Sequence, residues 1–316
     1  MECKEKVLLQ FPEGLKQYAY EYAKNLERKG ICVFLSARPS YGACDLAYWE
    51  AKIVGASKII HFGHAEFPFN GIKHMFNDIK VEYVVWREKI EEESIKILGK
   101  KLLNLGIKKV GLISTVQYTK NMSMASKVLS DMGITVILEK GNLGKEKGQI
   151  LGCDPSAALK EIKKGAEGIV FIGNGNFHPN ALAMIDINVP FYSFNPKNNK
   201  LNNLGEHIEK VKKRRKGIML SAIDAKTFGI LVSVKNGQYH LDIAESIKQK
   251  LEKLGKQAFI IVGDELSPLS ISNYTFIDAF ITTACPRIVD DTQTYSKPVL
   301  DLIMFNKLVE LLNELK

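Results

Sequence analysis

Short apolar stretches alternate along this chain with longer amphipathic stretches, a pattern that predicts β-strands alternating with α-helices. Gly30, Gly133 and Gly255 each follow a predicted helix, as expected for residues that end helices in the left-handed conformation. The predicted helices are 16–29, 45–53, 91–105, 120–132, 155–164 and 239–254.

The strand–helix pattern starts three times, with opening strands at 7–9, 110–113 and 229–234. Strands that alternate with helices are joined by right-handed crossovers and form parallel sheets. Restarts at intervals of roughly one hundred residues predict three similar small α/β domains, each a four-stranded parallel sheet flanked by helices. The expected domain ranges are 1–90, 91–200 and 201–316. The remaining predicted strands are 31–35, 58–62, 81–85, 134–138, 168–172, 189–194, 258–262 and 276–281.

Each predicted domain has one cysteine at a point where a strand is expected to end. Cys44 and Cys153 occupy equivalent loops after the second strand of copies one and two, and an aspartate follows each. Cys285 follows the third strand of copy three, where Pro286 bars a central strand from continuing. Ligands of open α/β sheets gather at the carboxyl ends of strands. The three domains can therefore surround one shared site in a pseudo-threefold arrangement.

Three thiolates suit two kinds of metal site. A four-iron four-sulfur cluster held by three cysteines keeps one iron open to a substrate. Zinc bound by three thiolates and a histidine such as His64 or His178 is the alternative. The wide spacing of the cysteines excludes zinc fingers and ferredoxin-type runs. Cys32 is expected in the core and Cys3 at a frayed terminus, and neither is assigned a role.

The charge of the chain comes mostly from lysine. The net charge is +9, and only six of the 44 basic residues are arginine. Lysines spread along helices usually form solvated faces, so no direct nucleic-acid binding is expected. The basic run 212–216 is interpreted as a solvated helix end, with an acidic macromolecular partner as the alternative.

The cysteine count and the apolar runs bear on where the protein works. Five scattered cysteines do not form a disulfide framework and favour a reducing compartment. No apolar run reaches the length of a membrane span, and a strand at 7–9 leaves no room for a signal peptide. A cytoplasmic protein is expected.

Two cysteine segments resemble the signatures of the archaeal-type diphthamide synthase family, the 2-(3-amino-3-carboxypropyl)histidine synthases. They are YGACD (41–45) and TACPRI (283–288), the latter followed by Asp290 and Asp291. The supporting segments are QFPEGL (10–15), HFGH (61–64), GNFHP (175–179) and GQ (237–238). These matches span nearly the whole chain.

The resemblance implies a homodimer in which each chain holds one 4Fe-4S cluster through Cys44, Cys153 and Cys285. Family members cleave S-adenosyl-L-methionine and transfer its 3-amino-3-carboxypropyl group to a histidine of translation elongation factor 2. This is the first step of diphthamide biosynthesis; methylthioadenosine is released, and an electron donor is needed. The CxxxCxxC run of the usual radical enzymes is absent from this sequence, in agreement with a noncanonical radical chemistry.

Several residues at strand ends are candidates for contact with S-adenosylmethionine. Turns after first strands carry backbone donors that suit a carboxylate, and Gly173 and Asn174 suit ribose or phosphate. Arg287 can fork a carboxylate or form a salt bridge with Asp290 or Asp291. The cofactor-binding candidates are Gln10, Glu13, Gly14, Tyr41, Gly173, Asn174, Gly237, Gln238 and Arg287.

His61, His64 and His178 follow third strands and therefore fall near the expected site. His64 and His178 are the catalytic candidates, as acceptors of the proton that the target imidazole loses. The alternative for each is a structural histidine bonded to a loop carbonyl.

The chain departs from the family pattern at Ala65-Glu66-Phe67 and after Pro298, and no function is assigned to either segment. Two other functions stay open. One is a quinolinate synthase-like enzyme, which also has three α/β domains and three spaced cysteines around a cluster. The other is a non-catalytic accessory or ligand-binding subunit.

Overall fold

The structure, a computed structural model, describes residues 4–69, 71–185 and 187–314. The chain forms two compact units. Unit 1 comprises Met1–Pro68 and Met75–Ile208, and unit 2 comprises Phe69–His74 and Glu209–Lys316. Unit 1 contains two β-sheets and unit 2 contains one. The three-domain boundaries near residues 90 and 200 stay a prediction.

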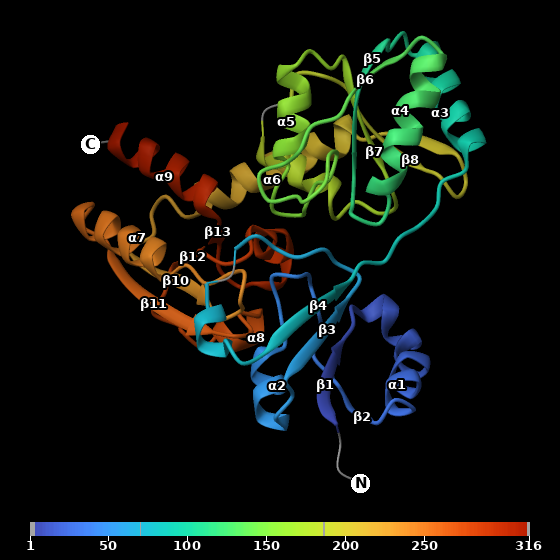
Figure 1. Ribbon diagram of the computed structural model, residues 1–316. Coiled ribbons are helices and arrows are strands. Elements are labelled where there is room, and N and C mark those ends of the chain that lie inside the picture. Colours follow the sequence, from blue (N-terminus) through green and yellow to red (C-terminus); the bar gives the residue numbers. More distant parts are fainter. Residues whose placement is uncertain (1–3, 70, 186, 315–316) are drawn as a thin grey trace. The chain divides into compact units, whose positions relative to one another are not determined.

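The first sheet of unit 1 is entirely parallel, with the strand order β2-β1-β3-β4. Figure 1 shows α1 and α2 on opposite faces of this sheet, as right-handed crossovers require when the chain moves outward in both directions from β1. The elements are β1 (Glu5–Gln10), a 3₁₀ turn η1 (Glu13–Tyr18), α1 (Ala19–Glu27), β2 (Ile31–Leu35), α2 (Tyr48–Val54), β3 (Lys58–Phe62), η2 (Lys73–Phe76) and β4 (Lys80–Val84).

The second sheet of unit 1 has the order β6-β5-β7-β8-β9, and β9 pairs with β8 in the antiparallel sense. Every residue of the central strand β7 is buried, because helices cover both faces of the sheet. The elements are α3 (Glu92–Asn104), β5 (Lys109–Ser114), η3 (Thr119–Asn121), α4 (Met122–Asp131), β6 (Thr135–Ile137), α5 (Ser156–Lys163), β7 (Gly168–Ile172), η4 (Pro179–Met184), β8 (Phe191–Asn195) and β9 (Lys200–Asn203).

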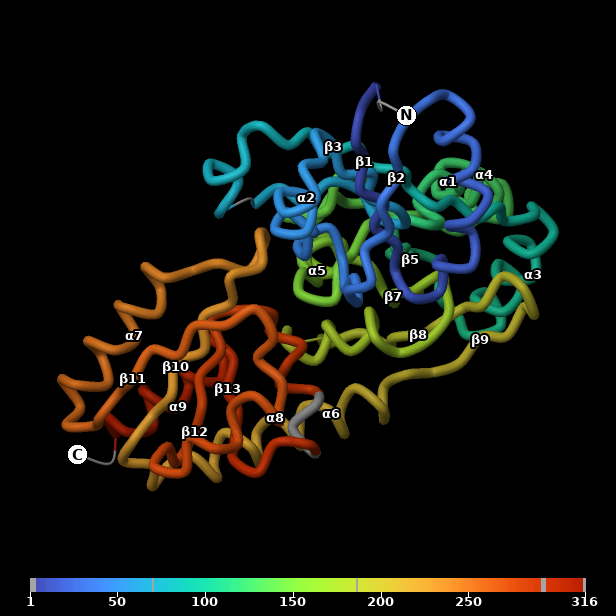
Figure 2. Tube along the Cα trace, turned by 90° about the horizontal axis from the view of Figure 1, so that it is seen from below, coloured from blue at the N-terminus to red at the C-terminus, as the bar shows by residue number. Residues whose placement is uncertain are grey.

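The sheet of unit 2 is parallel, with the order β11-β10-β12-β13. The traces in Figures 1 and 2 both show α7 alongside β10 and β11. The elements are α6 (Gly205–Ser221), β10 (Thr227–Ser233), α7 (Leu241–Lys253), β11 (Gln257–Gly263), α8 (Pro268–Ile271), β12 (Ala279–Thr282), η5 (Pro286–Thr294), β13 (Val299–Leu300) and α9 (Leu302–Glu314).

The predicted α/β fold of three similar sheets is confirmed, and β2, β3 and β7 coincide with predicted strands. The predicted strand 276–281 begins only at Ala279, because a turn closes from Ile277 N–H to the Tyr274 carbonyl over 3.1 Å. The predicted helix 45–53 begins only at Tyr48. The helix predicted at 16–29 is preceded by the 3₁₀ turn after Pro12.

Two elements near the carboxyl end were not predicted. β13 completes the sheet of unit 2, and α9 buries Met304, Phe305 and Leu308 in the same hydrophobic core. The segment after Pro298 is therefore part of the third core.

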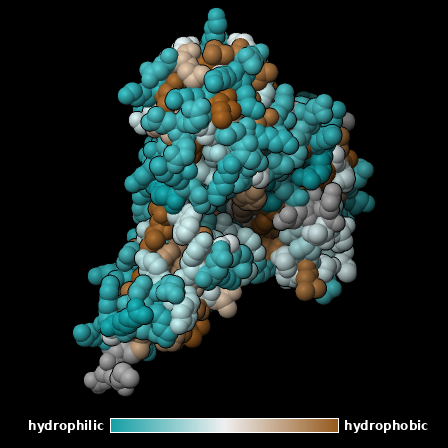
Figure 3. All heavy atoms as spheres, turned by 90° about the vertical axis from the view of Figure 1, so that its right-hand side faces the viewer, coloured by the Kyte–Doolittle hydropathy of each residue, from teal (hydrophilic) through white to brown (hydrophobic). Residues whose placement is uncertain are grey.

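The surface drawn in Figure 3 is mostly hydrophilic, with separate hydrophobic patches. Within the part of the chain that the structure describes, no helix combines the length and the apolar character needed to cross a membrane.

Candidate functional site

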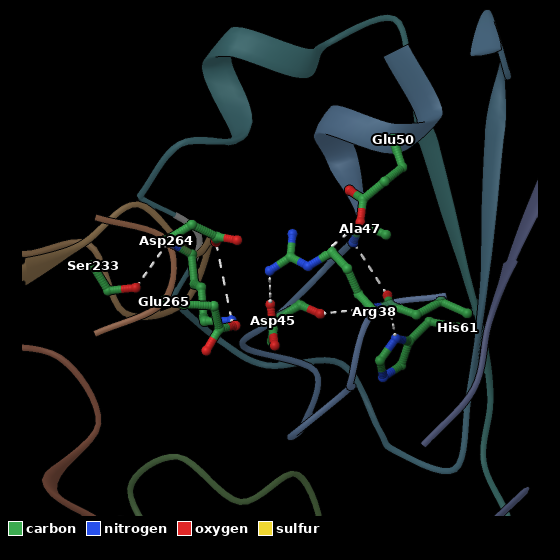
Figure 4. Close-up of polar contacts among 10 residues, drawn as sticks. Arg38, Asp45, Ala47, Glu50, His61, Ser233, Asp264 and Glu265 are labelled. Atoms are coloured by element: carbon green, nitrogen blue, oxygen red, sulfur yellow. Dashed lines mark hydrogen bonds and ion pairs between the residues drawn. The ribbon is translucent and has the colours of Figure 1, made fainter. Parts of the chain in front are cut away.

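Cys44 lies half-buried in the loop between β2 and α2, at the carboxyl end of the first sheet. Asp45, the next residue, is fully buried and anchors this loop. Its carboxylate accepts a hydrogen bond from Arg38 Nη2 at 3.0 Å (Figure 4). Its carbonyl accepts one from Gln10 Nε2 at 2.7 Å. The backbone beside the Cys44 thiol is thus held by two side chains from other segments.

Gln10, at the end of β1, connects this loop to two histidines. Gln10 Oε1 accepts a hydrogen bond from the Ala47 N–H at 3.2 Å and lies 2.9 Å from His61 Nδ1. His61 Nε2 lies 3.0 Å from His64 Nδ1. Gln10 and His61 are fully buried, whereas His64 is half-buried. The chain of hydrogen bonds therefore runs from the core towards the loop after β3.

Burial keeps both histidines neutral. Desolvation, with the neighbouring His64 as the smaller cause, lowers the pKa of His61 to about 3. Desolvation also lowers the pKa of His64 to about 4, against a hydrogen bond to the Phe62 carbonyl that raises it. Neither ring carries a positive charge at neutral pH.

Cys153 is half-buried in the loop between β6 and α5. As at Cys44, the aspartate that follows is buried and holds the loop. Asp154 accepts hydrogen bonds from the backbone N–H of Leu143 at 2.7 Å and of Ser156 at 3.0 Å. The second of these bonds lies at the start of α5, where Ser156 is the first helical residue.

Cys285 follows β12 in unit 2 and is also half-buried. Thr283 ties the strand end to β10, because both its N–H and its hydroxyl donate to the Leu231 carbonyl at 3.0 Å. The Cys285 carbonyl accepts a hydrogen bond from Ile288 N–H at 3.1 Å, which starts the 3₁₀ turn η5. β12 itself ends at Thr282, three residues before Cys285, and Pro286 is the first residue of η5.

The turn after Cys285 is held by a buried cluster of arginines and aspartates. Arg287 pairs with Asp290, the salt bridge that the sequence left as one of two alternatives. Asp290 also lies 3.6 Å from Arg214 and 4.0 Å from Arg215 of α6. Arg215 makes a further ion pair with Asp301.

The basic run 212–216 is therefore not simply a solvated helix end, because Arg215 is only 7% exposed. Acidic groups inside the same unit compensate its charge. Asp291, named with Asp290 as a possible partner of Arg287, has a side chain outside the described residues.

The loop after β10 buries the two predicted residues Gly237 and Gln238. Lys235, at the start of this loop, is 7% exposed and pairs with Glu265 at 2.7 Å. Its N–H donates to Ser233 Oγ at 3.1 Å; Ser233 and Glu265 are labelled in Figure 4. Backbone bonds close the loop, with Gln238 N–H donating to the Lys235 carbonyl at 3.0 Å.

Three other predicted residues lie on the surface. Glu13 is exposed and pairs with Lys16 at 2.6 Å, Gly14 is exposed, and Tyr41 is 64% exposed. That these three residues contact the cofactor remains a prediction.

The remaining candidates follow β7. Gly173 is buried with φ +155°, and a Cβ there would lie 2.9 Å from the Phe171 ring, so glycine is required by packing. Asn174 is exposed. The half-buried His178 ring lies parallel to Phe171 and edge-on to Phe177.

The cysteines divide into two groups. Cys44, Cys153 and Cys285 are reduced thiols, whereas Cys32 is disulfide-bonded. Cys32 is half-buried on the edge strand β2, so its expected place in the core was wrong. Cys3 lies outside the described residues.

The donor set fits an iron–sulfur cluster in its chemistry, because thiolates are the usual cluster ligands. No single unit supplies all three, since Cys44 and Cys153 belong to unit 1 and Cys285 to unit 2. Over residues 4–69, 71–185 and 187–314, no three His, Cys, Asp or Glu side chains are grouped closely enough to hold a metal ion.

Sequence reasoning missed Arg38, Arg215 and Lys235 as supports of these loops. The available signal was the scarcity of arginine, because four of the six arginines pair with aspartates around the loops of Cys44 and Cys285; they are Arg38, Arg214, Arg215 and Arg287. Lys235 carried no comparable signal among so many lysines.

Comparison with known proteins connects this chain to one family. Residues 11–310 match the family described as "Putative diphthamide synthesis protein". The 2-(3-amino-3-carboxypropyl)histidine synthase of Pyrococcus horikoshii is 35% identical, over 93% of this chain and 83% of that protein. The 2-(3-amino-3-carboxypropyl)histidine synthase subunit 1 of Saccharomyces cerevisiae is 27% identical, over 93% of this chain and 68% of that protein. The crystal structure of Dph2 from Pyrococcus horikoshii with a 4Fe-4S cluster superposes with a TM-score of 0.83, at 32% identity, covering 99% of this chain and 87% of that one.

Proposed function

This chain belongs to the diphthamide synthesis protein family, and we propose that it is a 2-(3-amino-3-carboxypropyl)histidine synthase. In this proposal it cleaves S-adenosylmethionine, transfers the 3-amino-3-carboxypropyl group to a histidine of translation elongation factor 2 and releases methylthioadenosine. It works in the cytoplasm as a homodimer that receives electrons from a separate donor.

The observation that carries the proposal is the set of three reduced cysteines, one at the carboxyl end of each sheet. Each is half-buried in a loop that neighbouring side chains hold in place. The related Dph2 contains a 4Fe-4S cluster. We assign Cys44, Cys153 and Cys285 as the cluster ligands, and the fourth iron stays open to the methionyl part of the substrate.

When bound, the cluster supplies the electron that cleaves the sulfonium. The protein holds the thiolates, shields the site from water and orients the two substrates. Asp45 and Asp154 serve this purpose by fixing the backbone next to their cysteines. Arg287 does the same for the turn after Cys285 through its pair with Asp290.

Contacts to S-adenosylmethionine are assigned to the loops at the carboxyl ends of the sheets. In unit 2 these are Gly237 and Gln238, in a loop closed by its own backbone bonds. In unit 1 the candidates are Gln10, Glu13, Gly14, Tyr41, Gly173 and Asn174. Gln10 is expected to position neighbouring residues, because its amide nitrogen and its amide oxygen both already have partners in the protein. We assign His64 and His178 as the residues that contact the imidazole of the target histidine.

The decisive experiment is purification without oxygen, analysis of iron and sulfide, and reduction in the presence of S-adenosylmethionine and elongation factor 2. We expect about four irons per chain, methylthioadenosine in solution and a mass increase on the target histidine. Formation of 5′-deoxyadenosine instead would contradict the proposed bond cleavage. A colourless protein loaded with zinc would rule out the cluster.

A further inference from the structure

The hydrogen bonds around Gln10 fix where the protons of the two histidines lie. Gln10 Nε2 donates to the Asp45 carbonyl, and Gln10 Oε1 accepts from the Ala47 N–H. The amide orientation is therefore set by a backbone acceptor at one end and a backbone donor at the other. Because Gln10 Oε1 can only accept, His61 Nδ1 must carry the proton that is shared across their 2.9 Å contact.

The same argument extends one ring further. A neutral imidazole protonated on Nδ1 has a bare Nε2 that can only accept. His64 Nδ1, 3.0 Å from His61 Nε2, must then be the donor. A neutral His64 has a single ring N–H, so the same Nδ1–H must also supply the hydrogen bond to the Phe62 carbonyl, and its Nε2 is bare.

We propose that Gln10 and His61 are positioning residues that hold His64 in one tautomer, so that its proton-free Nε2 accepts a hydrogen bond from an N–H group of a substrate. The inference rests on the proposed function, whose two substrates both supply such groups. They include the imidazole N–H of the target histidine and the ammonium group of S-adenosylmethionine.

The electrostatics of the pocket favour a hydrogen-bond acceptor over a general base. A useful base has a pKa near the working pH, whereas burial lowers the pKa of His64 to about 4. Tyr83, whose ring centroid lies 5.8 Å from that of His61, has a pKa raised by burial and stays neutral, and Glu66 influences Tyr83 rather than either histidine. In this proposal His64 acts as a neutral hydrogen-bond acceptor, and the sequence-based role as acceptor of the target proton stays a prediction.

Nuclear magnetic resonance tests the tautomer directly on ¹⁵N-labelled protein purified with its cluster. Long-range ¹H–¹⁵N spectra distinguish a bare ring nitrogen from a protonated one, and His61→Gln and His64→Gln variants assign the signals. We expect protonated Nδ1 and bare Nε2 in both rings, unchanged between about pH 5.5 and pH 8. A His64 that carries its proton on Nε2, or that titrates near its ordinary pKa, would overturn the inference.

Activity tests what the bare nitrogen does. His64→Leu removes the acceptor, and we expect kcat/KM to fall about tenfold, the value of one hydrogen bond. His64→Gln restores an acceptor oxygen and should recover part of the loss. His74→Ala is the matched control, because His74 is an exposed histidine of the following loop.

The assay distinguishes the two donors. If His64 binds the target imidazole, His64→Leu still releases methylthioadenosine at the normal rate without elongation factor 2, and only transfer falls. If it binds the ammonium group, both rates fall. Equal activity of His64→Leu and wild type in both assays would refute the inference. A wild-type protein that forms no methylthioadenosine would instead refute the proposed function, and the tautomer measurement would still stand.

Discussion

The carboxyl group of Glu161 in α5 has a pKa far from the ordinary value of a glutamate. It is fully buried, its Oε1 accepts a hydrogen bond from Glu139 N–H at 3.1 Å, and its Oε2 has no hydrogen-bond partner among the described residues. Desolvation raises its pKa to about 9, and the charge of Glu139 adds to the increase. The folded protein therefore holds a neutral carboxylic acid at neutral pH.

This residue should make stability depend on pH. Between pH 4.5, the ordinary value, and about 9 the unfolded chain releases a proton that the folded chain keeps. The free energy of unfolding should then fall as pH rises, by up to about 1.4 kcal/mol per pH unit. Glu161→Gln removes this loss, so it should be more stable than wild type at pH 8 and similar near pH 4. Denaturant titrations at several pH values measure this, and parallel curves for both proteins would contradict it.

The two kinds of cysteine predict opposite results on substitution. Cys153→Ala removes a proposed ligand and should lose the cluster or make it labile. Cys32→Ala removes a disulfide on an edge strand and should keep full iron and sulfide content, whatever it costs in stability. Iron analysis and absorption spectra of both variants test the assignment, and equal cluster content in the two would refute it.

At the scale of elements, α6 is attached to the rest of unit 2 by charges. Arg215 reaches Asp290 in η5 and Asp301 at the start of α9. Asp301 also accepts a hydrogen bond from Met304 N–H at 2.9 Å, which caps α9. One buried guanidinium thus connects three helical segments around the turn that carries Cys285.

Breaking this connection should be costly. Arg215→Met keeps most of the side-chain volume but leaves the buried Asp301 carboxylate without its ion pair, while Asp290 keeps Arg287 and Arg214. We therefore expect a loss of about 3–5 kcal/mol in the free energy of unfolding. Adding Asp301→Asn, which keeps the capping oxygen, should recover part of the loss. Lys213→Met, on an exposed position of the same helix, is the control. Chemical denaturation compares them, and an Arg215→Met protein as stable as this control would contradict the role of the cluster.

At the scale of the whole molecule, the hydrophobic pattern predicted the three sheets well, because buried parallel strands are continuous apolar runs such as β7. It missed β9, because Lys200–Asn203 are polar except for Leu201 and lie on a sheet edge. It also placed β12 too early, since Phe276 reads as a strand residue although it is 55% exposed in a turn.

For the candidate site, the sequence predicted the positions of the cysteine loops but not the side chains that support them. Strand ends located the cysteine loops, because a parallel sheet brings its carboxyl ends to one edge. The supports of these loops were not predictable, since Arg38 and Arg215 reach partners through tertiary contacts that no local pattern encodes. Gln10 stays a prediction as a cofactor contact, and its contact with His61 joins residues that are 51 positions apart in the sequence.

The proposed assignment of Cys44, Cys153 and Cys285 to one cluster makes a prediction about the whole chain. In the loaded protein, Cys44, Cys153 and Cys285 should all resist alkylation, because each sulfur is bound to iron. Chelation of the iron should make the three thiols reactive together, since losing one cluster releases every ligand at once. Cys32 should stay unlabelled in both states without a reductant, because its sulfur is in a disulfide. Mass spectrometry of labelled peptides follows each site, and a Cys285 that reacts equally fast before and after chelation would show that unit 2 does not contribute a ligand.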